Sequence, residues 1–228
     1  MIIAIEGIDG VGKGTQSKIL HDNLINFGLS ASLVSFPVYD SFFGKMIAEY
    51  LNGRYGSLND IHPKLVANLY AFDRWDYFNK HNINENEFMV IDRYVPSNLA
   101  HQASKLADRN HVYQMFEWID ELEHDVLGQP KPNLVLVLDA PVELASIQVL
   151  KKKSRSYTEL NKDLHEADEH YLGNVRSAYL ELCNNNDSYR LINCNESNNM
   201  KSIEGISREI WTIVVEYFSL SFNKYQAE

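Results

Sequence analysis

The sequence predicts an α/β fold: a doubly wound, five-stranded parallel sheet with helices on both faces. Short apolar runs recur along the 228 residues, with helical patterns between them, which is the order expected of parallel strands joined by crossover helices. The run 134–138 shows no alternation of polar and apolar residues, as expected for a strand covered on both faces. Ligands of such a sheet gather outside the carboxyl ends of its strands.

The expected elements alternate along the chain. Strands are expected where the apolar runs lie, at 2–6, 32–36, 88–92, 134–139 and 189–193. Helices are expected where apolar residues follow a helical period, at 15–27, 43–51, 63–80, 97–107, 113–125, 142–150, 163–183 and 203–218. Neither an internal repeat nor a long linker is visible, so residues 1–228 are expected to form a single domain.

Composition narrows the classes of partner. The chain has 21 basic and 31 acidic residues, a formal net charge of −10, which argues against a surface for nucleic acid or an anionic membrane. Its two cysteines, Cys183 and Cys194, lack the spacing of a metal site and favour a reducing compartment without disulfides. No apolar run approaches 18 residues and no signal-peptide pattern begins the sequence, so we expect no membrane span and a cytoplasmic location.

A glycine-rich turn follows the first expected strand. Residues 6–16 read Glu-Gly-Ile-Asp-Gly-Val-Gly-Lys-Gly-Thr-Gln and run into a helical pattern. This order favours a phosphate-binding loop, because glycines let backbone N–H groups face a polyphosphate while the next helix presents its positive N-terminus. An ordinary strand–turn–helix connection is the alternative. The expected ATP-binding residues in the loop are Gly7, Ile8, Asp9, Gly10, Val11, Gly12, Lys13, Gly14 and Thr15.

The loop departs from the strict phosphate-loop pattern at one position. That pattern has Ser or Thr directly after the lysine, where its hydroxyl binds magnesium. Here Gly14 follows Lys13, and the hydroxyl comes one residue later, at Thr15. The string Gly-Lys-Gly-Thr-Gln resembles the loop of nucleoside monophosphate kinases. We therefore predict phosphate binding with Lys13 as a charge on the terminal phosphates, and Mg²⁺ at Thr15, directly or through water.

Two arginines stand beside groups that suit a second nucleotide. Asp92 and Arg93 end the third expected strand, where Asp92 can order Mg²⁺ or its waters and Arg93 can bridge donor and acceptor phosphates. A structural ion pair is the alternative. Tyr70 and Arg74 lie four residues apart on one face of an expected helix. They suit a base site, a stacking ring beside a guanidinium donor, although such pairs more often pack on a surface.

A basic cluster occupies residues 150–165. Lys151, Lys152, Lys153 and Arg155 follow the fourth expected strand and its helix. A basic cluster is usually a solvated surface, but in an acidic chain with a phosphate-binding loop it favours a lid over the donor phosphates. Lys153 and Arg155 are the expected lid contacts.

Five strings in order make the chain resemble the thymidylate kinases from residue 2 to about 218. They are Glu-Gly-Ile-Asp-Gly-Val-Gly-Lys, Ser-Phe-Pro, Asp-Arg-Trp, Asp-Arg-Tyr-Val-Pro-Ser and Pro-Lys-Pro-Asn-Leu-Val-Leu-Val-Leu. Adenylate kinases share the loop, but this chain lacks their Asp-Gly-Phe-Pro-Arg motif. Deoxynucleoside kinases usually carry Glu-Arg-Ser in place of Asp-Arg-Tyr. The resemblance implies the P-loop nucleoside monophosphate kinase architecture with a lid.

The resemblance also implies a role for each matching residue. Asp9 matches the loop carboxylate beside the acceptor's 3′-hydroxyl and the transfer site, and Arg93 the clamp on the acceptor phosphate. Tyr70 matches the ring that stacks on thymine, and Arg74 the donor to the base O4. The remaining expected dTMP contacts are Phe36, Tyr39, Ser97, Gln102 and His165, of which His165 has a surface histidine as its alternative.

Two departures from the family stand out. Many members carry an arginine shortly after Phe-Pro, where this chain has Val38-Tyr39-Asp40, so Tyr39 or Lys45 is expected to take its place. Some members carry an arginine inside the phosphate loop, where this chain has Gly10. Others supply that arginine from the lid, which fits Arg155.

The implied activity is in-line transfer of the ATP γ-phosphoryl group to dTMP, with Mg²⁺, giving dTDP for DNA replication. Lys13, Asp9, Arg93 and Arg155 are the expected catalytic residues. The alternatives are a broader pyrimidine (d)NMP or deoxynucleoside kinase, and a nucleotide-dependent regulatory protein. The expected partners are dTMP, ATP and a second copy of the chain, with helix faces at 43–51 and 65–77 as its interface.

Overall fold

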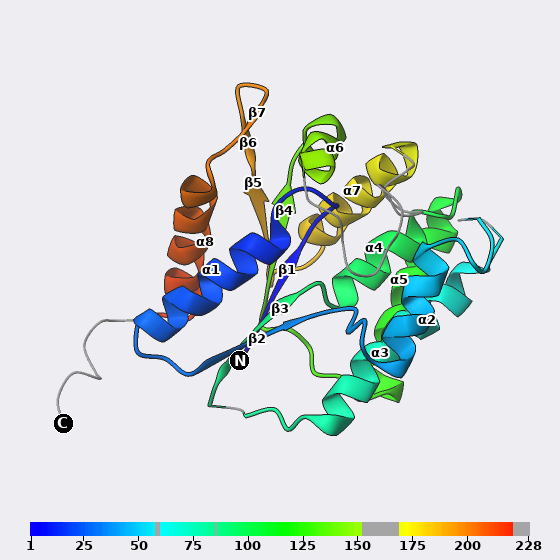
Figure 1. Ribbon diagram of the computed structural model, residues 1–228, viewed down its shortest axis with the longest axis horizontal. Coiled ribbons are helices and arrows are strands. Elements are labelled where there is room, and N and C mark those ends of the chain that lie inside the picture. The colour runs from blue at the N-terminus through cyan, green and yellow to red at the C-terminus, as the bar shows by residue number, and fades with distance from the viewer. Residues whose placement is uncertain (58–59, 85, 152–168, 221–228) are drawn as a thin grey trace.

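A five-stranded, all-parallel sheet forms the centre of the molecule in the order β2-β3-β1-β4-β5 (Figure 1). The computed structural model describes residues 1–57, 60–84, 86–151 and 169–220. The strands are β1 Ile2–Glu6, β2 Ala31–Ser35, β3 Phe88–Asp92, β4 Leu134–Asp139 and β5 Tyr189–Asn193. The predicted sheet is confirmed, with only its second strand displaced by one residue.

Helices cover both faces of the sheet, which makes the fold doubly wound. Helices α1 (Lys13–Asn26) and α8 (Ile203–Tyr217) lie on one face, and α4 (Val95–Ala103) and α7 (Glu169–Asn184) lie on the other (Figure 1). The other helices in the described ranges are α2 Phe42–Leu51, α3 Pro63–Lys80, α5 Arg109–Asp120, the π-helical turn η1 Glu121–Val126 and α6 Val142–Lys151.

Several helix boundaries differ from the predicted ones. The helix expected at 97–107 begins at Val95, because Pro96 falls in the first turn, where a missing N–H costs nothing. The helix expected at 113–125 begins at Arg109, because the Asp108 side chain caps it by accepting from the His111 N–H at 3.1 Å. It then changes to the π-helical η1, which the helical period did not predict.

Two further differences lie in the last third of the chain. Helix α7 is described from Glu169 onward and ends at Asn184, so residues 163–168 of the predicted helix lie outside the described residues. A short hairpin of β6 (Asn195–Glu196) and β7 (Asn199–Met200) follows β5 and was not predicted. Ser197 and Asn198 at its turn have φ of 47° and 64°, the left-handed conformation of a tight turn.

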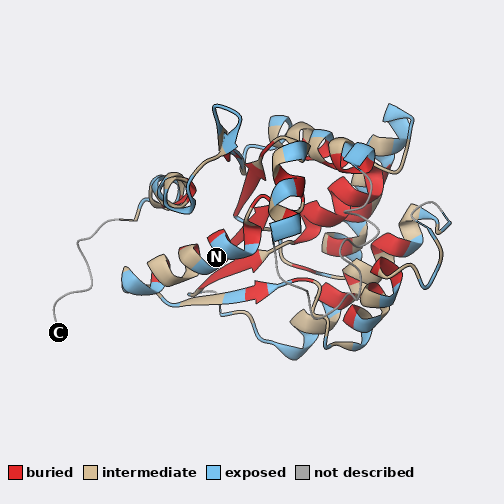
Figure 2. Ribbon diagram, turned by 45° about the horizontal axis from the view of Figure 1, so that its top comes forward, coloured by how far each residue is buried: buried red, intermediate tan, exposed pale blue. Residues whose placement is uncertain are grey.

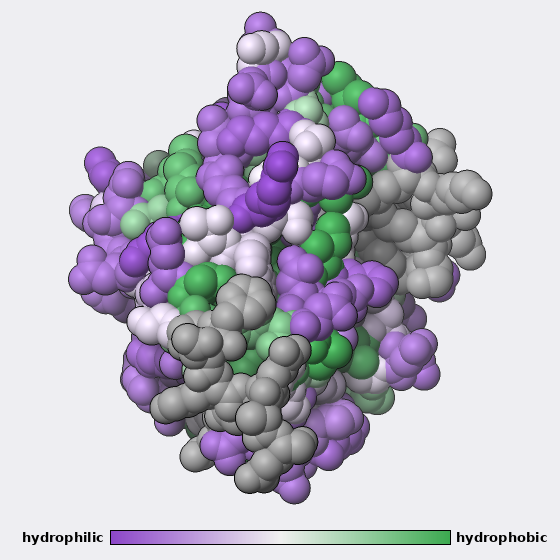
Figure 3. Space-filling model, turned by 90° about the vertical axis from the view of Figure 1, so that its left-hand side faces the viewer, coloured by the Kyte–Doolittle hydropathy of each residue, from purple (hydrophilic) through white to green (hydrophobic). Residues whose placement is uncertain are grey.

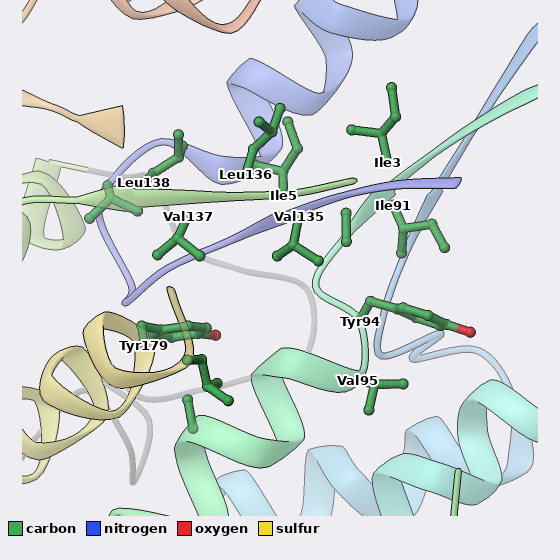
Figure 4. Packing of buried hydrophobic residues seen from close by; sticks show 14 of the residues in the cluster. Ile3, Ile5, Ile91, Tyr94, Val95, Val135, Leu136, Val137, Leu138 and Tyr179 are labelled. Carbon is green, nitrogen blue, oxygen red and sulfur yellow. The ribbon is translucent and has the colours of Figure 1, made fainter. Parts of the chain in front are cut away.

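The core lies on both faces of the three central strands. Ile3 pairs with Val90 on one side and Leu134 on the other, and all three are fully buried. Ile3 and Leu136 point toward α1, whereas Val135 and Val137 point toward α4 and α7 (Figure 4). Figure 2 shows the same arrangement as buried central strands with exposed outer helix faces. Burial on both faces explains why these strands have no polar alternation.

The surface is mainly polar where it is seen from the side of α1 and α8. Hydrophilic residues predominate there and the hydrophobic ones form separate groups (Figure 3), as expected for a chain of net charge −10. Within the described ranges, no helix has the length and apolar content needed to cross a membrane. Cys183 and Cys194 are both free thiols.

The sheet order brings two loops together. Ile5 in β1 pairs with Asp92 in β3, so both strands end at the same edge of the sheet. The loop after β1 and the residues after β3 therefore meet at the carboxyl ends of adjacent strands, where ligands of open α/β sheets bind.

Candidate active site

Glycines in left-handed conformations shape the loop after β1. Gly7, Gly10 and Gly12 have φ of 132°, 93° and 98°, which residues with a Cβ avoid. A Cβ on Gly10 would also clash with the backbone carbonyl of Ala145. An arginine at this loop position is therefore incompatible with the observed packing. Because Gly12 has no side chain to cap α1, the N–H groups of the first turn suit a phosphate oxygen instead.

Lys13 lies over this loop. Its side chain is 6% exposed, its Nζ donates to the Ile8 carbonyl at 2.8 Å, and the same atom lies 3.6 Å from Asp9 Oδ1. The ammonium group is thus held above the glycine turn, at the position predicted for a charge on the terminal phosphates.

Arg93 reaches from the end of β3 to the same loop. Its φ of 66° is uncommon for a residue other than glycine, and such residues concentrate at functional sites. Its Nη2 donates to Asp9 Oδ1, while its Nη1 donates to Ser97 Oγ at 3.3 Å and lies 3.4 Å from His101 Nε2. The guanidinium therefore lies beside the glycine turn, next to Asp9.

A buried carboxylate supports this end of the site. Glu6, at the end of β1, accepts hydrogen bonds from the Tyr94 N–H at 2.6 Å, Ser97 Oγ at 2.6 Å and the Tyr179 hydroxyl at 2.9 Å. Burial raises the pKa of Glu6, although the bonds from Ser97 and Tyr94 act in the opposite direction. The network ties β1, α4 and α7 together and orients Ser97 beside Arg93. The sequence analysis missed it.

Asp92 lies against the start of α1. A Cβ on Gly14 would lie 3.0 Å from Asp92 Oδ2. Gly14 is the position at which the strict loop pattern has a Ser or Thr hydroxyl, so the Asp92 carboxylate fills the space beside that position. Ser35 Oγ donates to Asp92 Oδ2 at 3.4 Å, whereas the buried Asp92 Oδ1 has no partner among the described residues. Thr15 is exposed in the first turn of α1. An unpartnered carboxylate oxygen fits a hydrated Mg²⁺, which typically uses one or two carboxylates together with water and phosphate.

A cavity opens beside Asp9 and Arg93. Its empty space amounts to about 510 Å³, part of which is open solvent. Its lining residues come from the loop after β1, the β2–α2 loop, α2, α3, the β3–α4 connection and α4. They are Asp9, Phe36, Pro37, Tyr39, Leu51, Tyr70, Arg74, Arg93, Ser97, Asn98, His101 and Gln102.

The structure brings most predicted acceptor-site residues into this one cavity. Eight of the nine predicted dTMP contacts line it. The ninth, His165, and the predicted lid contacts Lys153 and Arg155 lie outside the described residues. Lys45 is not among the lining residues, whereas Tyr39 is, so Tyr39 is the better placed of the two expected substitutes for the family arginine.

Arg74 is more deeply buried than a surface pair would be. It is 1% exposed, and its Nε and Nη2 donate to the two carboxylate oxygens of Glu123 at 2.6 and 2.5 Å. This bidentate pair rules out the alternative of surface packing and leaves Nη1 outside the pair. Tyr70 lines the same cavity one helical turn earlier.

Two buried amides that line the cavity each have an atom without a hydrogen-bond partner among the described residues. Asn98 is 2% exposed, and its Oδ1 has no hydrogen-bond partner among the described residues. Gln102 is fully buried, its Oε1 accepts from Lys105 Nζ at 2.7 Å, and its Nε2 has no partner there. The residues that line the cavity thus include one unpaired acceptor and one unpaired donor, the kind of polar groups that orient a ligand.

Asp73, the residue before Arg74 on α3, holds the segment between β2 and α2. Asp73 is 1% exposed and accepts from the Val38 N–H at 2.8 Å and from Ser41 Oγ at 2.7 Å. Ser41 in turn caps α2 by accepting from the Gly44 N–H at 2.8 Å. Asp73 therefore positions the segment that carries Phe36 and Tyr39. Burial raises the pKa of Asp73, although the hydrogen bonds from Ser41 and Val38 act in the opposite direction.

Sequence reasoning missed several residues of the site. On α4, Asn98 lies four residues before the predicted Gln102 and His101 lies four residues after the predicted Ser97, so a search for neighbours on the same helix face would have found both. Glu6 and Glu123 had no such signal, because their partners are distant in the sequence.

The chain is similar to known proteins over most of its length. A family profile described as thymidylate kinase matches residues 5–204. The chain is 30% identical over 221 residues to a probable thymidylate kinase of Sulfolobus acidocaldarius, covering 96% of this chain and 98% of that protein. It is 31% identical over 188 residues to the thymidylate kinase of Mycobacterium tuberculosis, covering 80% and 85%. The structure of the thymidylate kinase from Candida albicans superposes with a TM-score of 0.68 at 24% identity, covering 96% of this chain and 92% of that one, and so supports the fold.

Proposed function

We propose that this chain, which belongs to the thymidylate kinase family, transfers the γ-phosphoryl group of ATP to dTMP and releases dTDP and ADP. The family assignment makes the chain an ATP-dependent phosphotransferase. The observation that carries the specific proposal is that Asp9 and Arg93, the proposed phosphate end, line the same cavity as Tyr70, Arg74 and Asn98, the proposed base end.

The phosphate end suits phosphoryl transfer without a general base. The acceptor phosphate is itself the nucleophile, so the protein aligns it with the donor and balances the charge that develops. The glycine loop and Lys13 hold the donor phosphates, and Arg93 lies between the loop and the cavity, where it can contact both nucleotides. Asp9 orients Arg93 and faces the sugar of the acceptor.

Magnesium fits the unpartnered Asp92 carboxylate oxygen and the Thr15 hydroxyl at the start of α1. When bound there, directly or through water, the ion would neutralise charge on the donor phosphates. It belongs to the proposal together with ATP.

The base end matches the edge of thymine. Thymine presents a carbonyl, O4, beside an N–H, N3, and the cavity presents the Arg74 guanidinium as donor and Asn98 Oδ1 as acceptor. Cytosine presents an amino group and an unprotonated ring nitrogen, so both contacts would be mismatched. Buried mismatches of this kind discriminate by several kcal/mol. Tyr70 supplies the stacking ring.

Further parts of the proposal rest on the family resemblance. Lys153 and Arg155 act from the lid, and His165 contacts the acceptor. A homodimer and a cytoplasmic location are likewise proposed, as are the single domain and a role in supplying dTDP for DNA replication.

A coupled assay of ADP formation over a panel of dTMP, dUMP, dCMP, the ribonucleotides and thymidine tests the function. We expect dTMP to have the highest kcat/KM and dCMP to be a poor substrate. Equal turnover of dCMP and dTMP would support the broader pyrimidine kinase, and phosphorylation of thymidine would support a nucleoside kinase. ATP consumption that no acceptor changes would support a regulatory protein.

A further inference from the structure

Glu123 is a buried carboxylate for which the proposed reaction has no direct use. It lies in the π-helical turn η1 and is 0% exposed. Its Oε2 accepts from Arg74 Nε at 2.6 Å, and its Oε1 accepts from both Arg74 Nη2 at 2.5 Å and Asn98 Nδ2 at 2.7 Å. One carboxylate thus holds both side chains that face the base in the proposed complex.

These bonds determine which atoms face the cavity. Asn98 Nδ2 also donates to the Ala67 carbonyl at 3.0 Å, so both hydrogens of the amide are used and Oδ1 is the atom left without a described partner. Turning the amide over would place Oδ1 against two acceptor oxygens. On the other side of Glu123, the pair with Arg74 uses Nε and Nη2 and leaves Nη1 available as a donor.

The position of Glu123 depends on the π-helical turn. Such turns are rare and occur frequently at functional sites. The Gln129 N–H donates to the Glu123 carbonyl at 2.9 Å, and Gln129 Nε2 donates to the Ala71 carbonyl of α3 at 3.0 Å. The turn is therefore attached to α3 on the same side as Arg74, which gives Glu123 a defined position between α3 and α4.

We propose that Glu123 is a specificity-determining positioning residue that fixes a donor at Arg74 and an acceptor at Asn98. It thereby selects a pyrimidine with a carbonyl beside an N–H, as in thymine and uracil, over cytosine. The inference rests on the proposed function, because it assumes that a pyrimidine nucleotide occupies this cavity. In the proposed complex, Glu123 contacts no substrate atom; it acts through the Arg74 guanidinium and the Asn98 amide, which are called the reading groups below.

Glu123→Gln tests the proposal because it keeps the size of the side chain and removes one acceptor. A glutamine amide must direct its NH₂ group toward an N–H of Arg74 or of Asn98, so at least one reading group loses its partner. We expect the ratio of kcat/KM for dTMP to kcat/KM for dCMP to fall at least about tenfold. Most of this fall should come from a higher KM for dTMP. The dTMP to dUMP ratio and KM for ATP should stay unchanged, because the methyl site and the loop are elsewhere.

Glu123→Asp provides a second variant if the glutamine enzyme does not fold. It keeps the negative charge for Arg74, but its shorter side chain cannot reach both partners, so an intermediate fall in the ratio is expected. Glu181→Gln is the matched control, because Glu181 pairs with the exposed Arg109 away from the cavity, and it should keep the wild-type ratio.

The outcomes separate this inference from the proposed function. Wild-type enzyme that prefers dTMP to dCMP supports the function and makes the variants informative. A folded Glu123→Gln or Glu123→Asp enzyme that keeps the wild-type ratio would overturn the positioning role alone. A uniform loss on dTMP, dUMP and dCMP would also overturn it, since that is the signature of a structural role. Wild-type enzyme without any pyrimidine preference would overturn both.

Discussion

The proposed base end and the proposed phosphate end of the cavity are built in opposite ways. At the base end, Arg74, Asn98 and Glu123 are at most 2% exposed, lie on regular helices or a helical turn, and bond to one another. At the phosphate end, the Asp9 and Arg93 side chains are 17% and 19% exposed and come from a loop and a residue in a left-handed conformation. In the proposed complex, the base is therefore recognised by side chains whose positions are fixed by contacts within the protein, whereas Asp9 and Arg93 stay partly accessible to the nucleotides.

This difference predicts that substitutions at the base end lower stability, whereas substitutions at the phosphate end lower turnover. The reason is that removing one partner of a buried ion pair leaves the other charge buried and unpaired, while an accessible charge is still solvated.

Arg74→Met should have the largest effect on stability. It leaves the Glu123 carboxylate buried without its cation, so the free energy of unfolding should fall by about 3–5 kcal/mol. Urea denaturation followed by circular dichroism measures this. Arg109→Met, which breaks the exposed pair with Glu181, is the control and should change stability little. Equal effects of the two substitutions would contradict the comparison.

Arg93→Ala should have the largest effect on turnover. The variant removes the guanidinium between the loop and the cavity, so kcat should fall at least about a hundredfold. The fold should remain intact, because alanine and arginine are similarly strained at a φ of 66°. Steady-state kinetics beside a urea titration tests both parts, and Lys13→Ala should behave alike. Near-normal turnover of purified Arg93→Ala would refute the assigned role.

Lys105 is expected to have the smallest effect, a dependence of stability on pH. It supports the proposed base end through Gln102, which lines the cavity. Its Nζ donates to the Tyr50 hydroxyl at 2.9 Å and to Gln102 Oε1 at 2.7 Å, and burial lowers the pKa of Lys105 to about 7. An unfolded lysine keeps its proton up to a pH of about 10, so the unfolded chain binds more protons between these values. Stability should therefore rise with pH from about 7 to 10.

Lys105→Met isolates this contribution. Urea denaturation at pH 7, 8 and 9 should show the stability of the wild type rising relative to the variant by about 2 kcal/mol from pH 7 to pH 9. A difference between the two proteins that is independent of pH would show that Lys105 does not titrate there.

The parts of the fold that sequence predicted best are those set by local patterns. The strands at 2–6, 88–92 and 134–139 have the predicted bounds, because apolar runs of this length suit strands that are buried on both faces. The edge strand at 189–193 also has its predicted bounds, although only Ile192 in it is buried. Helix α3 also has its predicted bounds, with Pro63 in its first turn, where proline is favoured.

Other parts depended on partners that no local pattern reveals. The helical period of the sequence predicted that an α-helix continues to residue 125, but residues 121–126 form the π-helical η1. The role of Glu6 depends on Tyr179, which is 173 residues away. The family resemblance predicted eight of the residues that line one cavity, yet it left out Asn98 and His101 beside them.

Local sequence was thus sufficient for the sheet, for the glycine loop and for the types of residue that meet above it, because hydrophobic period and backbone chirality act over a few neighbouring residues. Tertiary structure alone decided which atoms of Arg74 and Asn98 face the cavity. The direction of a guanidinium or an amide depends on its hydrogen-bond partners, and Glu123 lies 49 and 25 residues away from these two in the chain.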